Sequence, residues 1–457
     1  MKTTRIRKLF ISSTLTVMLI LALQTYYSDR LSFGTSVVLT SQYSVHVRGH
    51  SQTVVTNKMK YSRYGTGTSI VKESLNEIIS QHSKYNGSAD ASQELHYIPK
   101  RRKLRIALYH VYHGLIKAHM RSLNMSSCFH YQNCEVVYIK PFTTGIIDAD
   151  AVLIQGNNVP NKLPKHRDKN QVFIFVTVES PIYLRFTNPY EKRVHNYFNW
   201  TMTYRIDSDI PYVYGSVIPN KVDKNYVIQS IEINNNFRNI GMNASLDEKV
   251  ISNYTGDVNK NYSDIFRQKT ETALWFVSHC RTPSKREVYA SELAKYTNVT
   301  KVGKCNMNRS SSCPKRSDCD TDWAKKYKFY LAFENSLCID YITEKAFLWF
   351  TRDIVIVVRG AIHYENYLPK GTFIDTNAFN SAKELAQHLN KVGANEEEYT
   401  NILKLKDHYS VIKEREHAQI SYCNLCYKLN NLNQYRKSIA NVNDWWNRHD
   451  CIRSNDI

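Results

Sequence analysis

Seven short apolar runs, rich in β-branched and aromatic residues, recur along the chain between residues 104 and 360. They are LRIALYHVY (104–112), VVYIKPF (136–142), AVLIQG (151–156), VFIFVTVESP (172–181), LWFVSHC (274–280), KFYLAFEN (328–335) and IVIVVRG (354–360). Each is typical of a buried strand, and helical lengths of chain separate them. The pattern predicts two α/β units, divided by a polar, Asn-rich stretch from about 234 to 264.

The N-terminus carries a basic flank followed by an uncharged run. Lys2, Arg5, Arg7 and Lys8 precede the segment 9–27, which is uncharged and long enough to span a bilayer. We expect a cytosolic tail (1–8), a signal-anchor transmembrane helix (9–27) and a Ser/Thr-rich stem (28–102), with the rest of the chain lumenal. A cleaved signal peptide and a buried helix are the alternatives.

Composition narrows the class of ligand. The 457 residues include 61 Lys and Arg against 41 Asp and Glu, a net charge of +20 that favours polyanions: nucleic acid, anionic membrane or a phosphorylated substrate. A lumenal chain meets little nucleic acid, so nucleotide-sugar diphosphates remain. Eight N-x-Ser/Thr sequons and ten cysteines agree with an oxidising, glycosylating compartment. The sequons are at Asn86, Asn124, Asn199, Asn243, Asn253, Asn261, Asn298 and Asn308.

Cys423-x-x-Cys426 admits two interpretations, a zinc site or a pair of disulfide partners. No second CxxC or HxxxH lies at finger spacing from it. We therefore predict a disulfide-linked structural role, although connectivity does not follow from sequence.

The richest chemical signal is FYLAFENSLCIDYITEKAF, residues 329–347. It predicts a buried strand ending at Glu334-Asn335, a polar loop, and a helix beginning at Glu344-Lys345 that Thr343 caps. Lys345 and the helix amino end suit a diphosphate, while Asn335 and Glu344 suit sugar hydroxyls. The alternative is an ordinary strand–turn–helix with surface charges.

This segment resembles the defining motif of the α-1,3-fucosyltransferases, glycosyltransferase family 10. Three further segments resemble the family in the same order: FVTVESP (175–181), FNWTMTYRIDSDIPYVYG (198–215) and FVSHCRTPSKREVY (276–289). The resemblance covers roughly residues 104–430. SHC…SKRE, GKC and CNLC are most similar to the invertebrate and plant branch.

The resemblance implies an α/β fold of GT-B type, with two Rossmann-like domains facing across a cleft. Residues 103–265 would form the acceptor-side domain, residues 266–430 the GDP-fucose-binding domain, and residues 431–457 a C-terminal tail.

By motif, Glu179 matches the catalytic base; its alternative role is to cap the turn that follows. Arg286, Asn335, Tyr341, Glu344 and Lys345 match donor-contacting positions. The implied reaction transfers L-fucose from GDP-β-L-fucose to a GlcNAc hydroxyl with inversion. One carboxylate removes the acceptor proton, while cations and a helix terminus stabilise the leaving diphosphate. No cofactor is required, and Mn²⁺ or Mg²⁺ would only stimulate.

Two acidic segments, Asp207-Ser-Asp209 and DCDTD (318–322), offer metal-binding alternatives. The family does not require a cation there, so we expect no metal site. Departures from the family pattern are Trp349 for Asn, Ile356 for Pro and Arg359 for Leu, which put efficiency and acceptor choice in doubt.

The expected partners are GDP-fucose, a glycoprotein N-glycan with a core or antennal acceptor, and the Golgi membrane, but no nucleic acid. The alternatives are a catalytically weak or inactive lumenal glycan-binding paralogue, and a lumenal lectin or matrix protein.

Overall fold

The computed structural model describes residues 102–454, with gaps at 110, 112–113, 140–145, 147, 157–158, 161, 165–166, 184–191, 235–258, 307–318 and 447–450. Before residue 102 it describes four short strands: β1 (Val38–Leu39), β2 (Ser44–Val47), β3 (His50–Thr53) and β4 (Met59–Lys60). The chain divides into two compact units, residues 1–98 and 99–457. The membrane helix expected over 9–27 lies outside the described residues. No helix in the described part of the chain has the length and apolarity that a bilayer crossing needs.

In the smaller unit, β1 pairs with β4 and β2 pairs with β3, both antiparallel. The first half of the larger unit is built on a six-stranded sheet in the order β10-β9-β8-β7-β5-β6. Its strands are β5 (Leu104–Tyr109), β6 (Cys134–Tyr138), β7 (Ala151–Gln155), β8 (Val172–Thr177), β9 (Trp200–Thr203) and β10 (Ile210–Pro211). All neighbouring strands are parallel. Every residue of β7 and β8 is buried, which explains their continuous apolar sequence.

The second half has a five-stranded parallel sheet in the order β13-β12-β14-β15-β16. Its strands are β12 (Glu271–Phe276), β13 (Val299–Val302), β14 (Tyr327–Phe333), β15 (Val355–Arg359) and β16 (Phe373–Asp375). Within this half the chain order is 2-1-3-4-5, one of the common orders of doubly wound sheets. Two parallel sheets confirm the predicted α/β class.

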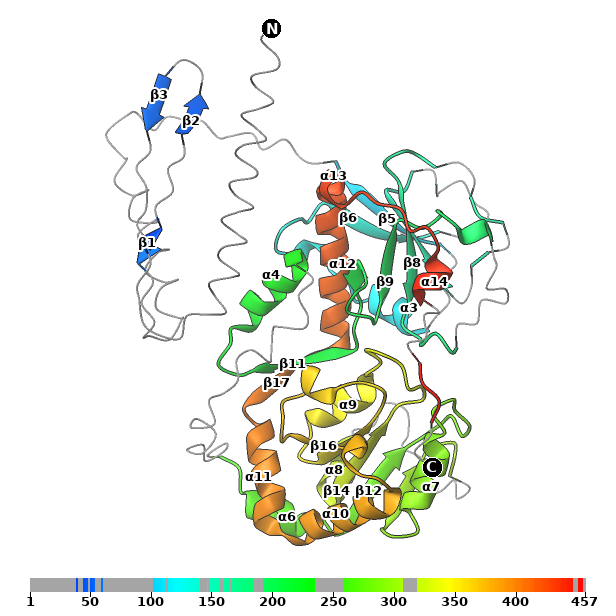
Figure 1. Cartoon of the computed structure of the whole chain (residues 1–457), viewed down its shortest axis with the longest axis vertical. Helices are drawn as coiled ribbons and strands as arrows, with labels where there is room; N and C mark the ends of the chain where they lie inside the picture. Colours follow the sequence, from blue (N-terminus) through cyan, green and yellow to red (C-terminus); the bar gives the residue numbers. More distant parts are fainter. Residues whose placement is uncertain are drawn as a thin grey trace. The chain divides into compact units, whose positions relative to one another are not determined.

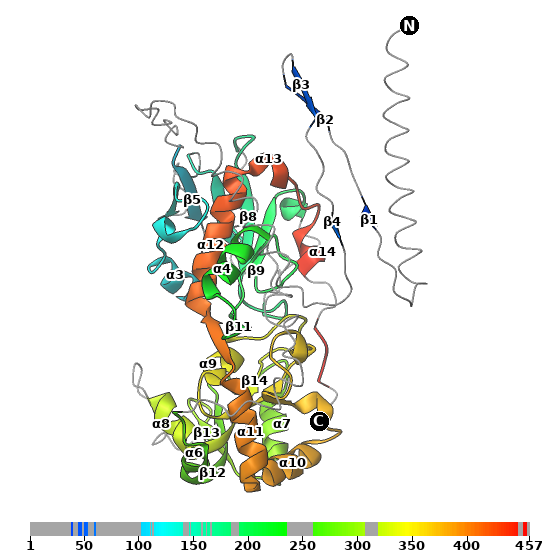
Figure 2. The ribbon, with the colours of Figure 1, turned by 90° about the vertical axis from the view of Figure 1, so that its left-hand side faces the viewer.

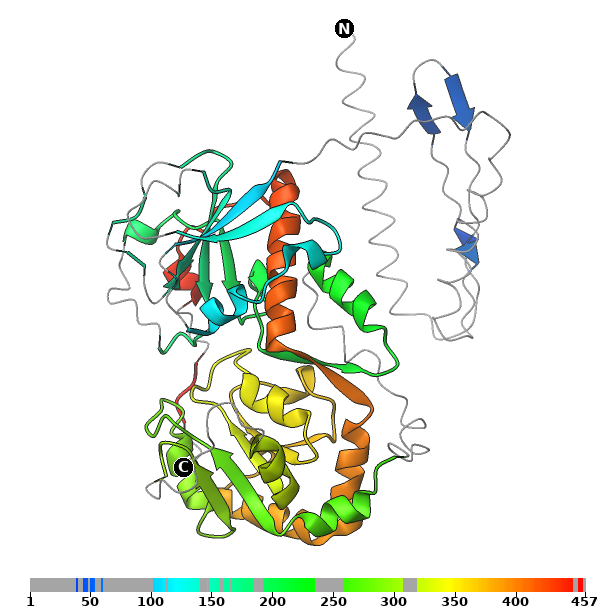
Figure 3. The same cartoon turned by 180° about the vertical axis from the view of Figure 1, so that it is seen from behind.

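Among the described residues, α-helices connect the first four strands of the second sheet in chain order, whereas in the first sheet only β5 and β6 have an α-helix between them (Figures 1 and 3). The first half contains α3 (Gly114–Met120) and α4 (Lys224–Asn234), with 3-10 turns at Met125–Ser127 and Lys192–Val194. The second half contains α6 (Tyr262–Gln268), α7 (Arg286–Leu293), α8 (Cys319–Lys326), α9 (Glu344–Phe350), α10 (Ala382–Ala394) and α11 (Glu396–Lys406). Further 3-10 turns lie at Tyr364–Asn366 and Thr376–Ala378.

The two faces of β14 bury into different cores. Phe329, Leu331 and Phe333 join a cluster with α7, α10 and α11. Tyr330 and Ala332, which alternate with them, join a second cluster that also contains the first sheet. One apolar core therefore continues from the first sheet to one face of the second. This shared core packs the two halves against each other through β14.

A short antiparallel ribbon carries the chain between the halves. It pairs β11 (Gly215–Pro219) with β17 (Tyr409–Lys413). A Cβ at Gly215 would lie 2.5 Å from the ring of Phe347, so glycine permits the close approach of α9 to this ribbon.

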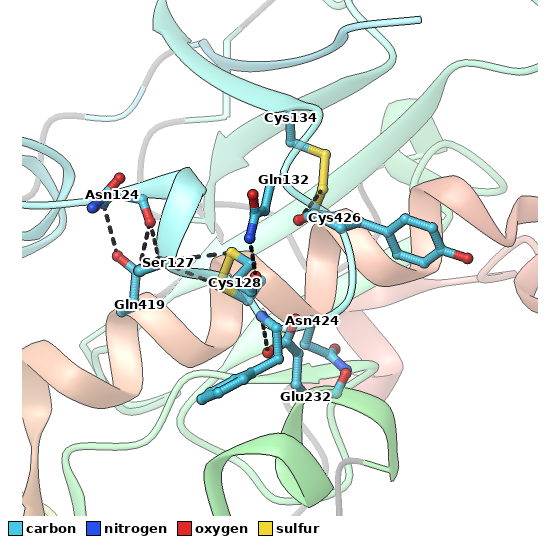
Figure 4. Close-up of a disulfide and its surroundings, with 12 residues drawn as sticks. Asn124, Ser127, Cys128, Gln132, Cys134, Glu232, Gln419, Asn424 and Cys426 are labelled. Atoms are coloured by element: carbon cyan, nitrogen blue, oxygen red, sulfur yellow. Dashed lines mark hydrogen bonds between the residues drawn. A yellow bond between two sulfur atoms is a disulfide. The ribbon is translucent and has the colours of Figure 1, made fainter. Parts of the chain in front are cut away.

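The helix that follows, α12 (Glu414–Asn430), returns to the first half and packs against α4 and α3 (Figures 1 and 2). Disulfides Cys128–Cys423 and Cys134–Cys426 fasten it there (Figure 4), which confirms the disulfide role predicted for the CxxC pair. Beside them, the Gln419 side chain donates to the carbonyl of Asn124 at 2.9 Å.

The structure differs from the expected boundary at residue 430, because α12 belongs by its contacts to the first half. Beyond it, α13 (Leu432–Tyr435) and α14 (Val442–Trp446) also pack on the first half. Trp446 is fully buried, and the Trp200 indole donates to the carbonyl of Tyr435 at 2.9 Å. Cys451 is bonded to Cys338 of the second half. The segment expected to be a tail is therefore part of the folded body.

Candidate active site

The loop after β14 is organised around the buried carboxylate of Glu334, which is 1% exposed. It accepts the backbone N–H of Thr343 at 2.8 Å, the Thr343 hydroxyl at 2.9 Å and the Lys345 ammonium at 3.2 Å. Thr343 occupies the N-cap position of α9, but its hydroxyl points to Glu334 and makes no capping bond. The predicted side-chain cap is therefore wrong, because the buried carboxylate competes for that hydroxyl.

Lys345 lies at the centre of the loop's charges. Its side chain is 18% exposed and donates to Glu334, to Thr343 at 2.7 Å and to Glu344 at 3.2 Å. Burial lowers the pKa of Lys345, but the negative charges of Glu334 and Glu344 prevail and the net shift is upward. Burial raises the pKa of Glu334, with Lys345 opposing. The ammonium is thus held charged in a largely enclosed position.

Glu344, the first residue of α9, is the accessible carboxylate of the loop. Its side chain is 49% exposed and contacts Lys345. Desolvation favours its neutral form, but Lys345 and Thr343 outweigh this and lower the pKa of Glu344. Glu344 therefore offers an ionised carboxylate to a ligand that binds at the start of α9.

Arg286 begins α7 and is 3% exposed. The preceding Lys285 adopts a left-handed conformation (φ 48°) that turns the chain into the helix. The Arg286 guanidinium donates to the carbonyl of Phe333 at 2.7 Å and lies over the Trp275 ring, 6.0 Å from its centroid. Among the described residues its Nε has no hydrogen-bond partner. Its charge also lowers the pKa of Lys345, so both cations act on one region.

Asn335 joins this loop to the segment before α7. Its carbonyl accepts the backbone N–H of Ser284 at 3.1 Å. The Ser284 hydroxyl donates to the carbonyl of Glu334 at 2.7 Å. The buried Asn335 Oδ1 has no hydrogen-bond partner within the described part of the chain, which leaves an acceptor for a ligand hydroxyl or N–H.

Tyr341 is 2% exposed and packs edge-to-face on Tyr204, with ring centroids 4.9 Å apart. Burial raises its pKa well above the ordinary value, and the charges of Glu179, Glu334 and Glu344 add to the shift. Tyr341 is therefore a neutral phenol in contact with the first half, surrounded by three carboxylates.

Glu179 follows β8 in the first half and is partly buried. Its backbone N–H donates to the Thr177 hydroxyl at 3.2 Å. The next residue reaches the loop after β14 directly, since the Ser180 hydroxyl donates to that of Ser336 at 2.7 Å. Because residues 334–345 carry the predicted donor contacts Asn335, Tyr341, Glu344 and Lys345, this segment is here called the donor loop. The structure thus brings the predicted base to the loop that carries Asn335, Tyr341, Glu344 and Lys345.

Sequence reasoning missed four residues of this region. The sequence predicts Glu334 only at the end of a strand, and its burial with Thr343 and Lys345 is shown by the fold. Tyr183 is 42% exposed, and the burial of the rest of its ring is the main cause of its raised pKa. The charges of Arg286, Glu179, Glu287 and Lys345 also act on this pKa, so Tyr183 feels both the predicted base and the cations.

The other two are Thr343, as an organiser of the carboxylate, and Glu414 at the start of α12. Burial and the neighbouring charge of Glu344 raise the pKa of Glu414 to about 8, with Lys345 opposing. No local signal could have identified Glu414, because it comes from a helix about 70 residues beyond the motif.

The two acidic segments have protein partners. Asp207 is paired with Arg205, and Asp209 accepts the Thr201 N–H at 2.9 Å and contacts Lys437 at 2.6 Å. In DCDTD, Asp322 is a surface residue paired with Lys325 at 3.2 Å. Cys128, Glu232 and Cys423 also lie close together, but the two sulfurs form a disulfide and are not free to bind a metal.

The departures from the family pattern are all accommodated inside the fold. Trp349 stacks on Tyr330 with centroids 3.9 Å apart. Ile356 is a buried residue of β15, paired with Tyr330. Arg359 is buried at the end of the same strand and donates to the carbonyl of Ser284 at 2.9 Å.

Comparison with known proteins matches both halves. Residues 102–215 match the family "Fucosyltransferase, N-terminal", and residues 266–445 match "Glycosyltransferase family 10 (fucosyltransferase) C-term". The chain is 32% identical over 326 residues to Alpha-(1,3)-fucosyltransferase C of Drosophila melanogaster, covering 70% of each protein. It is 28% identical over 321 residues to Alpha-(1,3)-fucosyltransferase fut-5 of Caenorhabditis elegans, covering 67% of this chain and 74% of the relative.

A solved structure of an alpha1,3-fucosyltransferase with GDP matches 69% of this chain and 84% of its own, with a TM-score of 0.42 and 14% identity. The sequence matches are sufficient to assign the family. They cover both halves of the chain and most of a relative that is more than 30% identical. The chain belongs to glycosyltransferase family 10, the fucosyltransferases.

Proposed function

We propose that this protein is an inverting α-1,3-fucosyltransferase that transfers L-fucose from GDP-β-L-fucose to a GlcNAc hydroxyl. The observation that carries the proposal is the contact between Ser180 and Ser336, which joins the Glu179 turn to the loop of Glu334 and Lys345. A proton acceptor and a cluster of cations therefore flank one region, as displacement of a diphosphate requires.

The donor half supplies charge stabilisation. Lys345 and Arg286 lie where they can neutralise the diphosphate, and Glu334 fixes the Lys345 ammonium in advance. All three Lys345 contacts are to protein oxygens, so a phosphate oxygen has to replace one of them. Glu344 is the partner most easily exchanged, because it is half exposed. Once released, its carboxylate is available to fucose hydroxyls.

The acceptor half supplies the base. Glu179 removes the proton from the GlcNAc hydroxyl as the acceptor oxygen forms its bond to the fucose anomeric carbon. The bond from that carbon to the diphosphate breaks on the opposite face, so GDP leaves with the electron pair and the configuration inverts. In this arrangement the two halves act as the acceptor and donor domains of a GT-B enzyme. No metal is required for this charge balance, and Mn²⁺ or Mg²⁺ only stimulates.

We further propose a Golgi membrane location, with residues 9–27 as a signal anchor and the catalytic unit lumenal. The acceptor is a glycoprotein N-glycan, at its core or antennal GlcNAc. The basic flank at Lys2–Lys8, the ten cysteines and the eight sequons support this setting. Nucleic acid is not expected as a partner.

The direct test is transfer from GDP-fucose to a panel of core and antennal GlcNAc glycans, with determination of the product linkage. An α-1,3-linked product is expected. GDP binding with no transfer to any glycan would favour the inactive, glycan-binding alternative. Absence of GDP binding would refute the donor site itself.

A further inference from the structure

The chain's last described segment, residues 451–454, lies directly on the donor loop. Cys451 forms a disulfide with Cys338 and pairs with it in an antiparallel bridge. The backbone N–H of Ile452 donates to the carbonyl of Leu337 at 2.8 Å. Both contacts fall between Asn335 and Tyr341, so this segment, here called the C-terminal clasp, holds the loop that carries two predicted donor contacts.

The clasp also reaches a buried arginine. Arg359, 1% exposed at the end of β15, donates one guanidinium nitrogen to the Ser454 hydroxyl at 3.0 Å. Its other terminal nitrogen donates to the carbonyl of Ser284 at 2.9 Å. The guanidinium stacks on Tyr289 of α7, 4.8 Å from the ring centroid. A buried guanidinium needs its donors satisfied, so each of these contacts constrains its position.

Arg359 thereby couples the clasp to the segment that starts α7. Ser284 lies two residues before Arg286 and is hydrogen-bonded to both Asn335 and Glu334 of the donor loop. Three chain segments, the ends of β14 and β15 and the turn before α7, therefore meet around Ser284. The clasp contacts these segments through Ser454, which bonds to Arg359, and through Cys451, which bonds to Cys338.

We propose that residues 451–454 and Arg359 position the GDP-fucose site, holding the Asn335–Tyr341 loop and Arg286 in one arrangement. The inference rests on the proposed donor site, because it assigns no ligand contact to the clasp. Arg359 and Ser454 act together through the hydrogen bond between them.

The sharpest test removes a single hydroxyl. Ser454→Ala takes away the Arg359 partner, while Ser454→Thr retains a hydroxyl as the conservative rescue. Calorimetry gives GDP affinity, and steady-state kinetics give donor KM, acceptor KM and kcat. Residues that act on a site without touching its ligand typically shift binding by about two- to thirtyfold. We expect weaker GDP binding and a higher donor KM in this range for Ser454→Ala, an unchanged acceptor KM, and recovery in Ser454→Thr.

A second pair of variants tests the whole clasp. Deletion of residues 451–457, combined with Cys338→Ser, is compared with deletion of residues 455–457 alone, which keeps Cys451, Ile452 and Ser454 and the contacts described for them. The longer deletion should weaken GDP binding more than Ser454→Ala, and the shorter deletion should not change it.

Lys345→Ala separates failure of the inference from failure of the donor site. If Lys345→Ala weakens GDP binding but Ser454→Ala and the longer deletion leave GDP affinity and donor KM unchanged, the clasp has no positioning role. A lower melting temperature at unchanged GDP affinity also overturns it, because the contacts are then only structural. Unchanged GDP affinity in Lys345→Ala overturns the donor site and the inference together.

Discussion

Removal of the Lys345 ammonium should affect stability as well as donor binding. Within the described part of the chain, the buried Glu334 carboxylate then keeps only Thr343 as a side-chain hydrogen-bond donor. Breaking a buried ion pair from one side costs about 3–5 kcal/mol. The backbone N–H and the hydroxyl of Thr343 still donate to Glu334, and the hydroxyl lies 2.9 Å from both carboxylate oxygens. Because Lys345 is also 18% exposed, we expect Lys345→Ala to lower the free energy of unfolding by about 2 kcal/mol.

The partner substitution separates the two effects. In Glu334→Gln/Lys345→Ala no buried charge is left unpaired, so the double variant should be about 1–2 kcal/mol more stable than the sum of the single changes predicts. GDP affinity should not recover, because the phosphate contact is still absent. We expect a loss of about ten- to hundredfold in both variants that lack the lysine.

The pH dependence gives an independent check. Burial already raises the folded-state pKa of Glu334, and loss of Lys345 should raise it further. A carboxyl with a raised folded pKa stabilises the protein below its unfolded pKa, and this stability is lost as the pH rises through the folded value. The penalty of Lys345→Ala should therefore grow as the pH rises through the folded-state pKa that Glu334 has in the wild type. Denaturant unfolding and GDP calorimetry on the same preparations measure all three effects. Strictly additive energies, or a penalty that does not vary with pH, would refute the pairing.

Three further predictions concern the chemistry. Glu179→Gln should reduce turnover by about two to four orders of magnitude, with GDP affinity and melting temperature nearly unchanged. Near-normal turnover would show that Glu179 only caps the turn, and Glu344 would be the next carboxylate to test as the base. Transfer should continue in a chelator such as EDTA, since Arg286 and Lys345 provide the positive charge; complete loss that added Mn²⁺ reverses would reopen Asp207 and Asp209 as ligands. Glu414, whose pKa is raised to about 8, becomes negatively charged above that pH, and its charge then opposes the positive charge of Lys345. Donor KM should therefore rise above about pH 8 in the wild type and change less with pH in Glu414→Gln. Identical pH profiles of donor KM in the two proteins would contradict an influence of Glu414 on Lys345.

The strands were predictable because their apolar runs are continuous. β7 and β8 are buried at every position, so their sequence carries no polar alternation that could mislead. The donor loop was also predictable as a unit, because Asn335 and Lys345 are close in sequence and one loop places both.

Contacts between distant segments were not predictable. Glu334 and Thr343 lie nine residues apart, and only the fold shows that the hydroxyl serves the carboxylate and not the helix. Similarly, the return of α12 and the clasp depends on partners 295 and 113 residues away, at Cys128 and Cys338. Local periodicity says nothing about such pairings, which is why residues 431–457 were expected to be a tail.

The two α12 disulfides make the second half an insertion within the first half. The sequence separations of 295 and 292 residues enclose the whole second sheet. During synthesis from the N-terminus, the first sheet emerges early, but the helix that fastens it emerges only after the second sheet is complete. Cys128 and Cys134 therefore cannot form their native disulfides until α12 has been made, and they can mispair during that interval. The chain enters the inserted second half through β11 and leaves it through β17. The first half can therefore complete its fold only after α12, which follows β17, has been synthesised.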